Sequence, residues 1–368
     1  MDAITFSHIN SPLHKAVLLA DEKKIESIVK SGALIDRIDK DGNTEIHLSV
    51  IHGQLRCLRL LRELGADVDR KNKDGYTPMH LAVIHNSVCA LDILIELKAN
   101  IDLVNNKAII RHHWEICHLL ISSGANVDLV NAEGNRPLHL ALTQDEAEKF
   151  VSVLIPIVEK INALDDNDDR PLHLAVMYNR FAAMRKLLLR AKVNYFNGSG
   201  NNVLHLAVML GREDFIKLVA FNLIVDSTNQ EGNRPIHLAV LSDYPQVIRA
   251  LSYRRASMNG RNGAGDTALH LAACHNKTSA IKELMHCNAD INFMNLKKHT
   301  PLMLAMKYSS VDAFKLLLIY KPNLHLCDSN GETPFAPGCM LQKRHSFESL
   351  IQHGPGIHCI DSKGRTFA

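Results

Sequence analysis

The sequence has no long apolar run and almost no excess of one charge. Its 368 residues include 42 Lys and Arg against 39 Asp and Glu, which leaves a formal net charge of +3 at pH 7. A helix that spans a bilayer needs about 20 largely apolar residues in succession, so we expect no membrane insertion. A net charge this small also argues against nucleic acid or a membrane surface as the partner.

Cysteine is present, but not with the spacing of a disulfide or zinc framework. The eight cysteines are scattered along the chain, and none forms a Cys-x-x-Cys pair. Single cysteines placed among apolar residues are typical of reduced proteins. We therefore expect a reducing compartment, the cytoplasm first and the nucleus as the alternative.

Motifs of catalysis are also missing from the sequence. We find no phosphate-binding loop, no Ser-His-Asp order and no paired carboxylate motif. The pairs Cys274-His275 and His286-Cys287 could suggest zinc, but a helix should separate the two pairs. The acidic run 165–169 could bind calcium, but it is better explained as a connecting loop. We expect no cofactor, no metal and no enzymatic activity.

What the sequence does contain is one short motif that returns at a nearly constant interval. One copy is Thr77-Pro78-Met79-His80-Leu81-Ala82, and the steps between successive motif histidines are 33, 33, 59, 34, 32, 32 and 33 residues. These histidines are His14, His47, His80, His139, His173, His205, His237 and His270. A period of about 33 residues indicates a stacked array of similar units.

Each part of the motif has a physical reason. Thr77 can cap a helix through its hydroxyl, and Pro78 suits the first helical position, where no backbone donor is lost. A small residue follows each motif histidine by two positions, which lets neighbouring helices approach closely. The apolar spacing then predicts a second helix over about 88–97. One such unit cannot bury its apolar face alone, so stacking must do so.

The motif Asp-x-x-Gly-x-Thr-Pro-Leu-His-x-Ala resembles the ankyrin repeat, and the resemblance covers residues 8 to 368. It implies an all-α solenoid of about eleven helix-turn-helix repeats joined by hairpin loops, with the chain forming one array. The predicted repeats are 8–40, 41–73, 74–106, 107–131 (truncated), 132–165, 166–197, 198–229, 230–262, 263–295, 296–328 and 329–361, with a partial twelfth at 362–368.

The fourth repeat departs from this pattern. Aligning Ala108 with Ala82 shows seven residues missing, which accounts for the 59-residue step (66 minus 7), whereas the second helix, 114–122, is retained. Either the loss is natural and marks a bend, or the sequence reflects an imperfect gene model or a splice variant. The eleventh repeat is also distorted, because Pro337-Gly338 falls inside its first helix.

The resemblance also assigns roles to individual residues. It implies that the motif histidines tie each turn by hydrogen bonds to the loop backbone and to the neighbouring turn, so they are structural. Leu284, Asp290, Ile291 and Asn292 resemble the pattern around asparagines that are hydroxylated in ankyrin repeats. Asn292 is therefore a candidate for hydroxylation, with an unmodified loop asparagine as the alternative.

In this family the partner surface is the concave side, formed by loop tips and the exposed side of the first helices. The scaffold positions are fixed by packing, so specificity should lie in the residues that vary there, above all in repeats five to ten. The candidates for partner binding are Tyr76, Arg136, Tyr178, Arg180, Asn202, Arg234, Tyr244, His275, Lys298 and Tyr308.

The function expected from these features is that of a non-catalytic scaffold or adaptor that binds a protein partner on the concave surface. One alternative is the substrate-recognition arm of a ubiquitin ligase or another larger assembly. A lower-ranked alternative is an inhibitor that masks a transcription factor. We expect a monomer with protein partners of unknown identity, since family membership specifies a scaffold and not a target.

Overall fold

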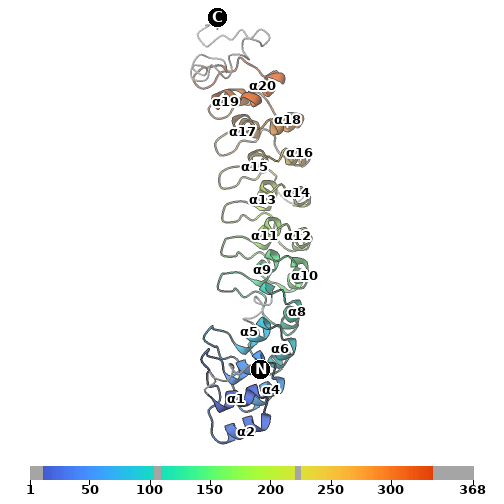
Figure 1. Ribbon diagram of the computed structural model, residues 1–368. Coiled ribbons are helices and arrows are strands. Elements are labelled where there is room, and N and C mark those ends of the chain that lie inside the picture. Colours follow the sequence, from blue (N-terminus) through green and yellow to red (C-terminus); the bar gives the residue numbers. More distant parts are fainter. Residues whose placement is uncertain (1–10, 103–108, 220–224, 335–368) are drawn as a thin grey trace. The chain divides into compact units, whose positions relative to one another are not determined.

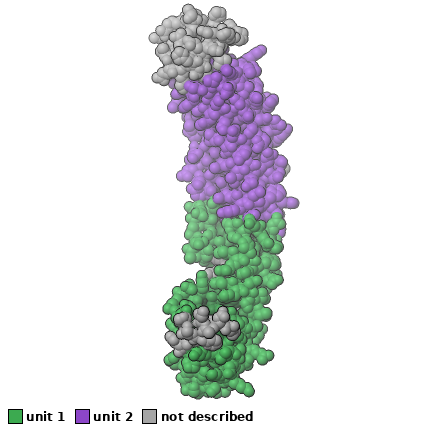
Figure 2. Space-filling view, in the orientation of Figure 1, with its two compact units in different colours: residues 1–171 green, residues 172–368 purple. Residues whose placement is uncertain are grey.

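The computed structural model describes residues 11–102, 109–219 and 225–334, and the fold is built from short helices in pairs (Figure 1). The chain divides into two compact units, residues 1–171 and 172–368, which Figure 2 colours separately. Each unit is described by itself below. The described residues contain helices and turns but no strand.

The first helix of each repeat is seven residues long and begins at or beside the motif's proline position. In unit 1 these helices are α1 (Pro12–Leu18), α3 (Glu45–Ile51), α5 (Pro78–Ile84) and α9 (Pro137–Thr143). In unit 2 they are α11 (Pro171–Met177, beginning at the unit boundary), α13 (Val203–Met209), α15 (Pro235–Leu241), α17 (Ala268–Cys274) and α19 (Pro301–Lys307).

The second helices follow after a short turn and stack on one another in each unit. In unit 1 they are α2 (Glu22–Lys30), α4 (Leu55–Glu63), α6 (Val88–Glu96), α8 (Trp114–Ser122) and α10 (Ala147–Ile157). In unit 2 they are α12 (Phe181–Leu187), α14 (Glu213–Val219), α16 (Pro245–Tyr253), α18 (Thr278–His286) and α20 (Val311–Ile319). The prediction of an all-α repeat fold is confirmed.

The motif begins each first helix as its chemistry predicts. In α5 the backbone amide of His80 donates to Thr77 Oγ1 at 3.4 Å, and the backbone amide of Thr77 donates to His80 Nδ1 at 3.2 Å. The two residues therefore satisfy each other's backbone amides, as Ser and Glu do in an ordinary capping box. Pro78 occupies the first helical position without losing a hydrogen bond.

The same histidine also links one repeat to the next. His47 Nε2 lies 2.9 Å from the carbonyl oxygen of Tyr76, in the following hairpin. His205 and Ser227 O form the equivalent contact at 3.1 Å, and His270 and His299 O form it at 2.9 Å. Because Nδ1 accepts from the cap amide, the proton must lie on Nε2, which donates to the carbonyl. Each such histidine is therefore neutral and held in one tautomer, and the predicted structural role is confirmed.

Burial of these imidazole rings lowers their pKa. His205 and His237 are fully buried, and burial lowers the pKa of each to about 4 despite the backbone hydrogen bonds, which act in the opposite direction. Burial also lowers the pKa of His47, His139 and His270. A second proton would sit on Nδ1 and face the cap amide, so protonation conflicts with the cap as well as with burial.

We predict that the fold loses stability as the pH falls from about 6.5 towards 4. A lowered folded pKa means that the unfolded chain binds the proton first, so the stabilisation is complete above the unfolded pKa of about 6.5 and is lost below it. For His205 and His237 the loss should reach on the order of 2–3 kcal/mol each. Urea unfolding followed by circular dichroism between pH 7.5 and 4.5 measures it.

The control is the double variant His205→Gln, His237→Gln, which should be less stable at pH 7.5 but less sensitive to acid. Equal stability of the native protein at pH 7.5 and 4.5 would contradict the prediction. So would an acid response in the double variant as steep as that of the native chain.

Glu45 is the one motif position where the usual proline is replaced by a buried acid. Its side chain is fully buried, accepts from the backbone amide of Asp36 at 3.0 Å and lies 3.4 Å from His14 Nε2. Burial raises the pKa of Glu45 to about 7. A raised folded pKa favours the fold at low pH and opposes it as the pH rises above about 4.5, which is opposite to the effect of the histidines. Unit 2 is therefore the better place to observe the histidine effect.

Small residues at the centre of each first helix let the helices pack closely. Fully buried residues of this kind are Ala16, Ser49, Ala82 and Ala141 in unit 1, and Ala175, Ala207, Ala239, Ala272 and Ala305 in unit 2. The first helices α13, α15, α17 and α19 pack in series, each on the next. Leucine and isoleucine side chains from the second helices complete the same core, for example Leu251, Ile281 and Leu284. The core of each unit therefore runs along the stack.

The hairpins between repeats are shaped by one Asx residue each. Asn229 Oδ1 accepts from the backbone amides of Glu231 and Asn233 at 3.1 and 2.9 Å, which closes the turn. In the acidic run, Asp165 accepts from the amides of Asn167 and Asp169 in the same way. The run is thus a loop, as predicted, whose leading carboxylate is used by its own backbone.

The turn glycine is needed for more than its positive φ. Gly232 has φ of +74°, and a Cβ there would lie 2.5 Å from the Cα of Gly263 in the next hairpin. Gly75 has the same place in its repeat and φ of +77°, but a Cβ there would meet none of the described residues within 4 Å. The two positions therefore share a backbone conformation, and only Gly232 has a described hairpin backbone against it.

We predict different costs for the two matched substitutions. Gly75→Ala should destabilise by about 1 kcal/mol, the cost of alanine at positive φ. Gly232→Ala should cost roughly 2 kcal/mol more, because two hairpin backbones must move apart. Chemical unfolding of both variants measures the difference, and equal costs would contradict the proposed close approach.

The irregular repeats are only partly visible. Helix α8 confirms the predicted second helix of the fourth repeat, and Ile109 just before it is fully buried. Ala108 and the other residues at 103–108, on which the truncation was inferred, lie outside the described residues. So do Pro337-Gly338 and the partial twelfth repeat at 362–368. Within the parts that are described, no helix combines the length and the apolar character needed to cross a bilayer.

Candidate functional site

The candidate surface is the front face, by which we mean the hairpin tips together with the exposed ends of the first helices. The tips are held in register by side-chain amides. Asn262 Nδ2 donates to Asn233 Oδ1 at 3.2 Å, and Asn229 Nδ2 donates to Asn201 Oδ1 at 3.0 Å. The front face of each unit is therefore a pre-organised surface, which lowers the entropy cost of binding.

Four of the predicted binding residues are exposed on this face in unit 2. Tyr178, His275 and Tyr308 occupy the same place in three repeats, directly after α11, α17 and α19. Lys298 lies at a hairpin tip and is also exposed. Tyr178 and Tyr308 are 43% and 55% exposed, so both rings can contact a partner. Aromatic side chains of this kind are frequent anchors of interfaces.

Five other candidates are half-buried, and the structure shows four of them in contact with the repeat scaffold. The Tyr76 ring stacks on the ring of His80 with a centroid distance of 6.0 Å. Arg136 Nη1 donates to the carbonyl of Leu164 at 3.2 Å. Tyr244 packs against Gly211, where a Cβ would lie 2.7 Å from its ring. Arg180, at the start of α12, is also half-buried.

Arg234, the fifth of this group, is strongly tied to its neighbours. Its guanidinium lies 3.4 Å from the carboxylate of Asp226, donates to the carbonyl of Asp226 at 3.3 Å and donates to the carbonyl of Arg261 at 3.2 Å. It joins two successive hairpins. Substitution of Arg234 would therefore disturb the scaffold as well as any contact with a partner.

Asn202 does not belong to the exposed set. It is 1% exposed, its Oδ1 accepts from the backbone amide of His205 at 3.0 Å, and its Nδ2 donates to Ser227 Oγ at 2.8 Å. It takes the capping role that Thr77 has in α5. The sequence places Asn202 directly before its helix, which is a capping position, and this signal identifies its role.

The sequence analysis missed the apolar residues that end the first helices of unit 2. Met177, Met209, Leu210 and Leu241 are exposed by 39–40% and lie beside Tyr178 or at the equivalent place in the next repeats. We call these four residues with Tyr178 the apolar stripe. Met177, Met209 and Leu241 are spaced by 32 residues, so an alignment of the repeats could have found them. Flexible methionines adapt to varied partner surfaces.

Asn292, the hydroxylation candidate, belongs to a second hydrogen-bonded series. Its Oδ1 accepts from the backbone amide of Asn323 in the next repeat at 2.7 Å. Asn259 bonds in the same way to the amide of Asp290, and Asp226 bonds to the amide of Ser257. The Asn292 side chain therefore stabilises the connection between repeats, and an enzyme that modifies it has to displace this bond. Its hydroxylation stays a prediction.

We predict that Asn292→Ala lowers stability by about 1 kcal/mol, the usual value of one hydrogen bond. Asn292→Asp should be close to neutral, because Asp226 fills the equivalent position elsewhere. Urea unfolding measures the free energy of unfolding of both variants. If alanine and aspartate behave alike, the bond to Asn323 contributes nothing.

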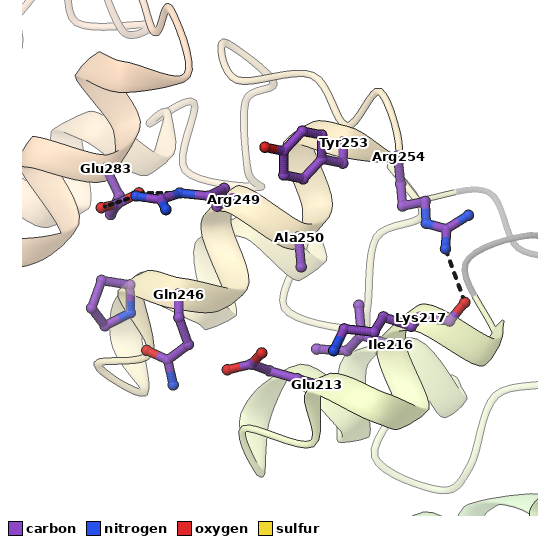
Figure 3. A pocket seen from close by; sticks show the side chains of 10 residues that line it. Glu213, Ile216, Lys217, Gln246, Arg249, Ala250, Tyr253, Arg254 and Glu283 are labelled. Carbon is purple, nitrogen blue, oxygen red and sulfur yellow. Dashed lines mark hydrogen bonds and ion pairs between the residues drawn. The ribbon is translucent and has the colours of Figure 1, made fainter.

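A groove lies on the other side of unit 2, between the second helices α14 and α16 (Figure 3). It encloses about 540 Å³ and is lined by Ile216 and Ala250, with Glu213, Lys217 and Arg254 among its charged residues. Arg254 Nη2 donates to the carbonyl of Lys217 at 3.1 Å. Arg249 makes a two-pronged pair with Glu283, with bonds of 2.8 to 3.1 Å. Such a lining provides contacts for recognition and no nucleophile beside a base.

In the portion of the chain that the structure describes, no group of three His, Cys, Asp or Glu side chains could hold a metal ion. Cys274 and Cys287, considered for zinc, lie at the end of α17 and just after α18. Burial raises the pKa of the Cys274 thiol. A thiol of this kind is a poor nucleophile, since the thiolate is the reactive form.

A family model described as "Ankyrin repeats (3 copies)" matches residues 12–105, 106–197, 186–262 and 269–362. The chain therefore belongs to the ankyrin repeat family. Among solved structures, it is similar to the ankyrin repeat domain of Bcl-3, titled a unique member of the IkappaB protein family. That match has 23% identity and a TM-score of 0.51, and covers 66% of this chain and 99% of the other. It shows the fold alone. No curated protein matches the sequence.

Proposed function

We propose that this protein is a non-catalytic adaptor that binds another protein on the front face of unit 2. Ankyrin repeats generally mediate protein–protein interaction, and the apolar stripe is the observation that carries the assignment to this face. The neighbouring polar groups of the scaffold are engaged by capping and by bonds between hairpins. The stripe residues, by contrast, expose apolar surface at the same place in successive repeats. Exposed apolar surface of this kind marks an interaction site.

The arrangement of the stripe suits an elongated partner. Met177, Met209 and Leu241 come from α11, α13 and α15, which follow one another in unit 2 (Figure 1). Helix layers pack about 8–10 Å apart, so the stripe offers apolar contacts at a regular interval. Tyr308 and Lys298 extend the surface towards α19. A helix or an extended segment with apolar residues along one side would fit these positions.

One alternative, ranked lower, is an inhibitor that masks a transcription factor. The other alternative is a recognition arm of a ubiquitin ligase or another larger assembly. Both use the same face, so they differ in the identity of the partner rather than in the mode of binding. Partner identification therefore distinguishes all three functions.

The test is quantitative capture from cell lysate with the full chain as bait, followed by mass spectrometry. The stripe variant is Tyr178→Ser, Met209→Ser, Leu241→Ser. The matched control, Leu189→Ser, Tyr253→Ser, Ile319→Ser, makes the same chemical change at exposed positions of the second-helix side. A partner retained by the native chain and the control, but weakened at least 10-fold by the stripe variant, is expected.

Circular dichroism must show the same thermal midpoint for all three baits. Equal recovery by the native chain and the stripe variant would overturn the proposal. Recovery of a transcription factor or of ubiquitin ligase subunits at the stripe would assign the corresponding alternative.

A further inference from the structure

The second helices of unit 2 carry an unusual edge at their C-terminal ends. The three most exposed large apolar side chains of the described residues are Leu189, Tyr253 and Ile319, at 84%, 81% and 72%. All three occupy the ninth position counted from the start of their helices, α12, α16 and α20. In unit 1 the ninth positions of α2, α4 and α6 hold Lys30, Glu63 and Glu96. Apolar tips at this place are therefore not a requirement of the fold.

Within the sequence windows that hold these tips, every charged residue is a base. The windows 185–192, 249–256 and 315–322 contain nine bases and no acid: Arg185, Lys186, Arg190, Lys192, Arg249, Arg254, Arg255, Lys315 and Lys321. The intervening window of α18, 282–289, adds Lys282 and Glu283. The corresponding windows of unit 1, 26–33, 59–66 and 92–99, contain four bases and four acids. We call the three basic windows of unit 2 the basic edge.

Helix stability alone does not account for this difference. Bases near a helix C-terminus interact favourably with the helix dipole, and this applies equally in both units. In unit 1, however, acids sit among the bases and form pairs, such as Glu96 with Arg59. In unit 2 Arg249 pairs with Glu283, while Arg185, Arg255 and Lys315 are exposed at the surface. The small net charge of the whole chain hides this separation.

We propose that the basic edge of unit 2 binds the surface of an anionic lipid membrane. Bases attract anionic headgroups, and exposed leucine, isoleucine and tyrosine side chains can enter the boundary between headgroups and acyl chains. The tips come from alternate repeats, so at about 10 Å per layer they extend over roughly 40 Å. A broad, flat partner meets all three at once, whereas a single peptide pocket does not. Two of the three tips, Leu189 and Ile319, are aliphatic, which favours lipid over single-stranded nucleic acid, because the latter is bound by stacking on aromatic rings.

Tyr253 connects this edge to the groove described above. It borders the groove between α14 and α16 (Figure 3). It also lines a second depression, together with His286 and Asn288. The ring thus stands out between two hollows and is accessible from both. This proposal concerns the side formed by the second helices and does not depend on the front face. Both surfaces could act together, with the membrane holding the chain while the front face binds its protein.

The test is co-sedimentation of the full chain with vesicles of phosphatidylcholine alone or of phosphatidylcholine and phosphatidylserine at a 70:30 ratio. We expect at least 10-fold stronger binding to the anionic vesicles, weakened by high salt. The variant Arg185→Gln, Arg255→Gln, Lys315→Gln should bind roughly 100-fold more weakly, since each base near the surface contributes about a factor of five. The variant Leu189→Ser, Tyr253→Ser, Ile319→Ser should bind about 10-fold more weakly.

The matched control is Lys23→Gln, Arg56→Gln, Lys98→Gln, which removes the same charge from exposed positions on, or just after, second helices of unit 1. It should bind as the native chain does, and all variants should keep its thermal midpoint. If the control loses as much binding as the unit 2 variant, non-specific charge explains the attraction and the proposal is overturned. It is also overturned if both vesicles bind equally, or if a DNA duplex binds more tightly than the anionic vesicles and the apolar variant binds it unchanged.

Discussion

The structure depends on one repeated interaction, in which a buried neutral histidine connects the cap of its own helix to the hairpin of the next repeat. In His47, His205 and His270, Nδ1 receives the cap amide and Nε2 donates to a carbonyl 22 or 29 residues later in the sequence. The ring bonds both to the cap of its own helix and to the next repeat, so it sets both the start of the helix and the spacing of the stack. Because the ring is buried, protonation disfavours both the helix cap and the bond to the next repeat. The stability of the array therefore depends on pH.

This arrangement leaves the surface free to vary. Asx side chains and the histidines bond to backbone groups of the hairpins, and side-chain amides link neighbouring tips. Exposed positions therefore carry little of the folding free energy, and they differ between the two units. Unit 2 combines apolar first-helix ends, such as Met209 and Leu241, with a basic edge around Leu189 and Tyr253 on its second helices. At the corresponding positions of its second helices, unit 1 carries both acids and bases. Unit 2 thus has two distinct surfaces, for which we propose a protein and an anionic membrane as the partners.

The fold could be predicted well from the sequence because the motif residues determine the local structure directly. Thr77, Pro78 and His80 specify a helix start, and their 33-residue recurrence specifies the stack. The surface was harder to predict, since exposure depends on neighbouring repeats. Asn202 looked like a variable tip residue, yet its position before the helix makes it a cap. Arg234 looked like an interface anchor, yet it joins two hairpins. Met177 and Leu189 were not among the predicted site residues, and their exposed fractions identify them in the structure. The basic edge was hidden because net charge was taken over the whole chain.

The central claim is that the motif histidines are structural, neutral and held in one tautomer. The most direct measurement is the long-range ¹H–¹⁵N spectrum of the imidazole rings at pH 7. The claim predicts that the rings of His205, His237 and His270 show a protonated Nε2 and an unprotonated Nδ1 at pH 7, and that the rings of His205 and His237 remain so down to about pH 5. A mixture of tautomers, or titration near pH 6.5 as in an unfolded chain, would contradict it.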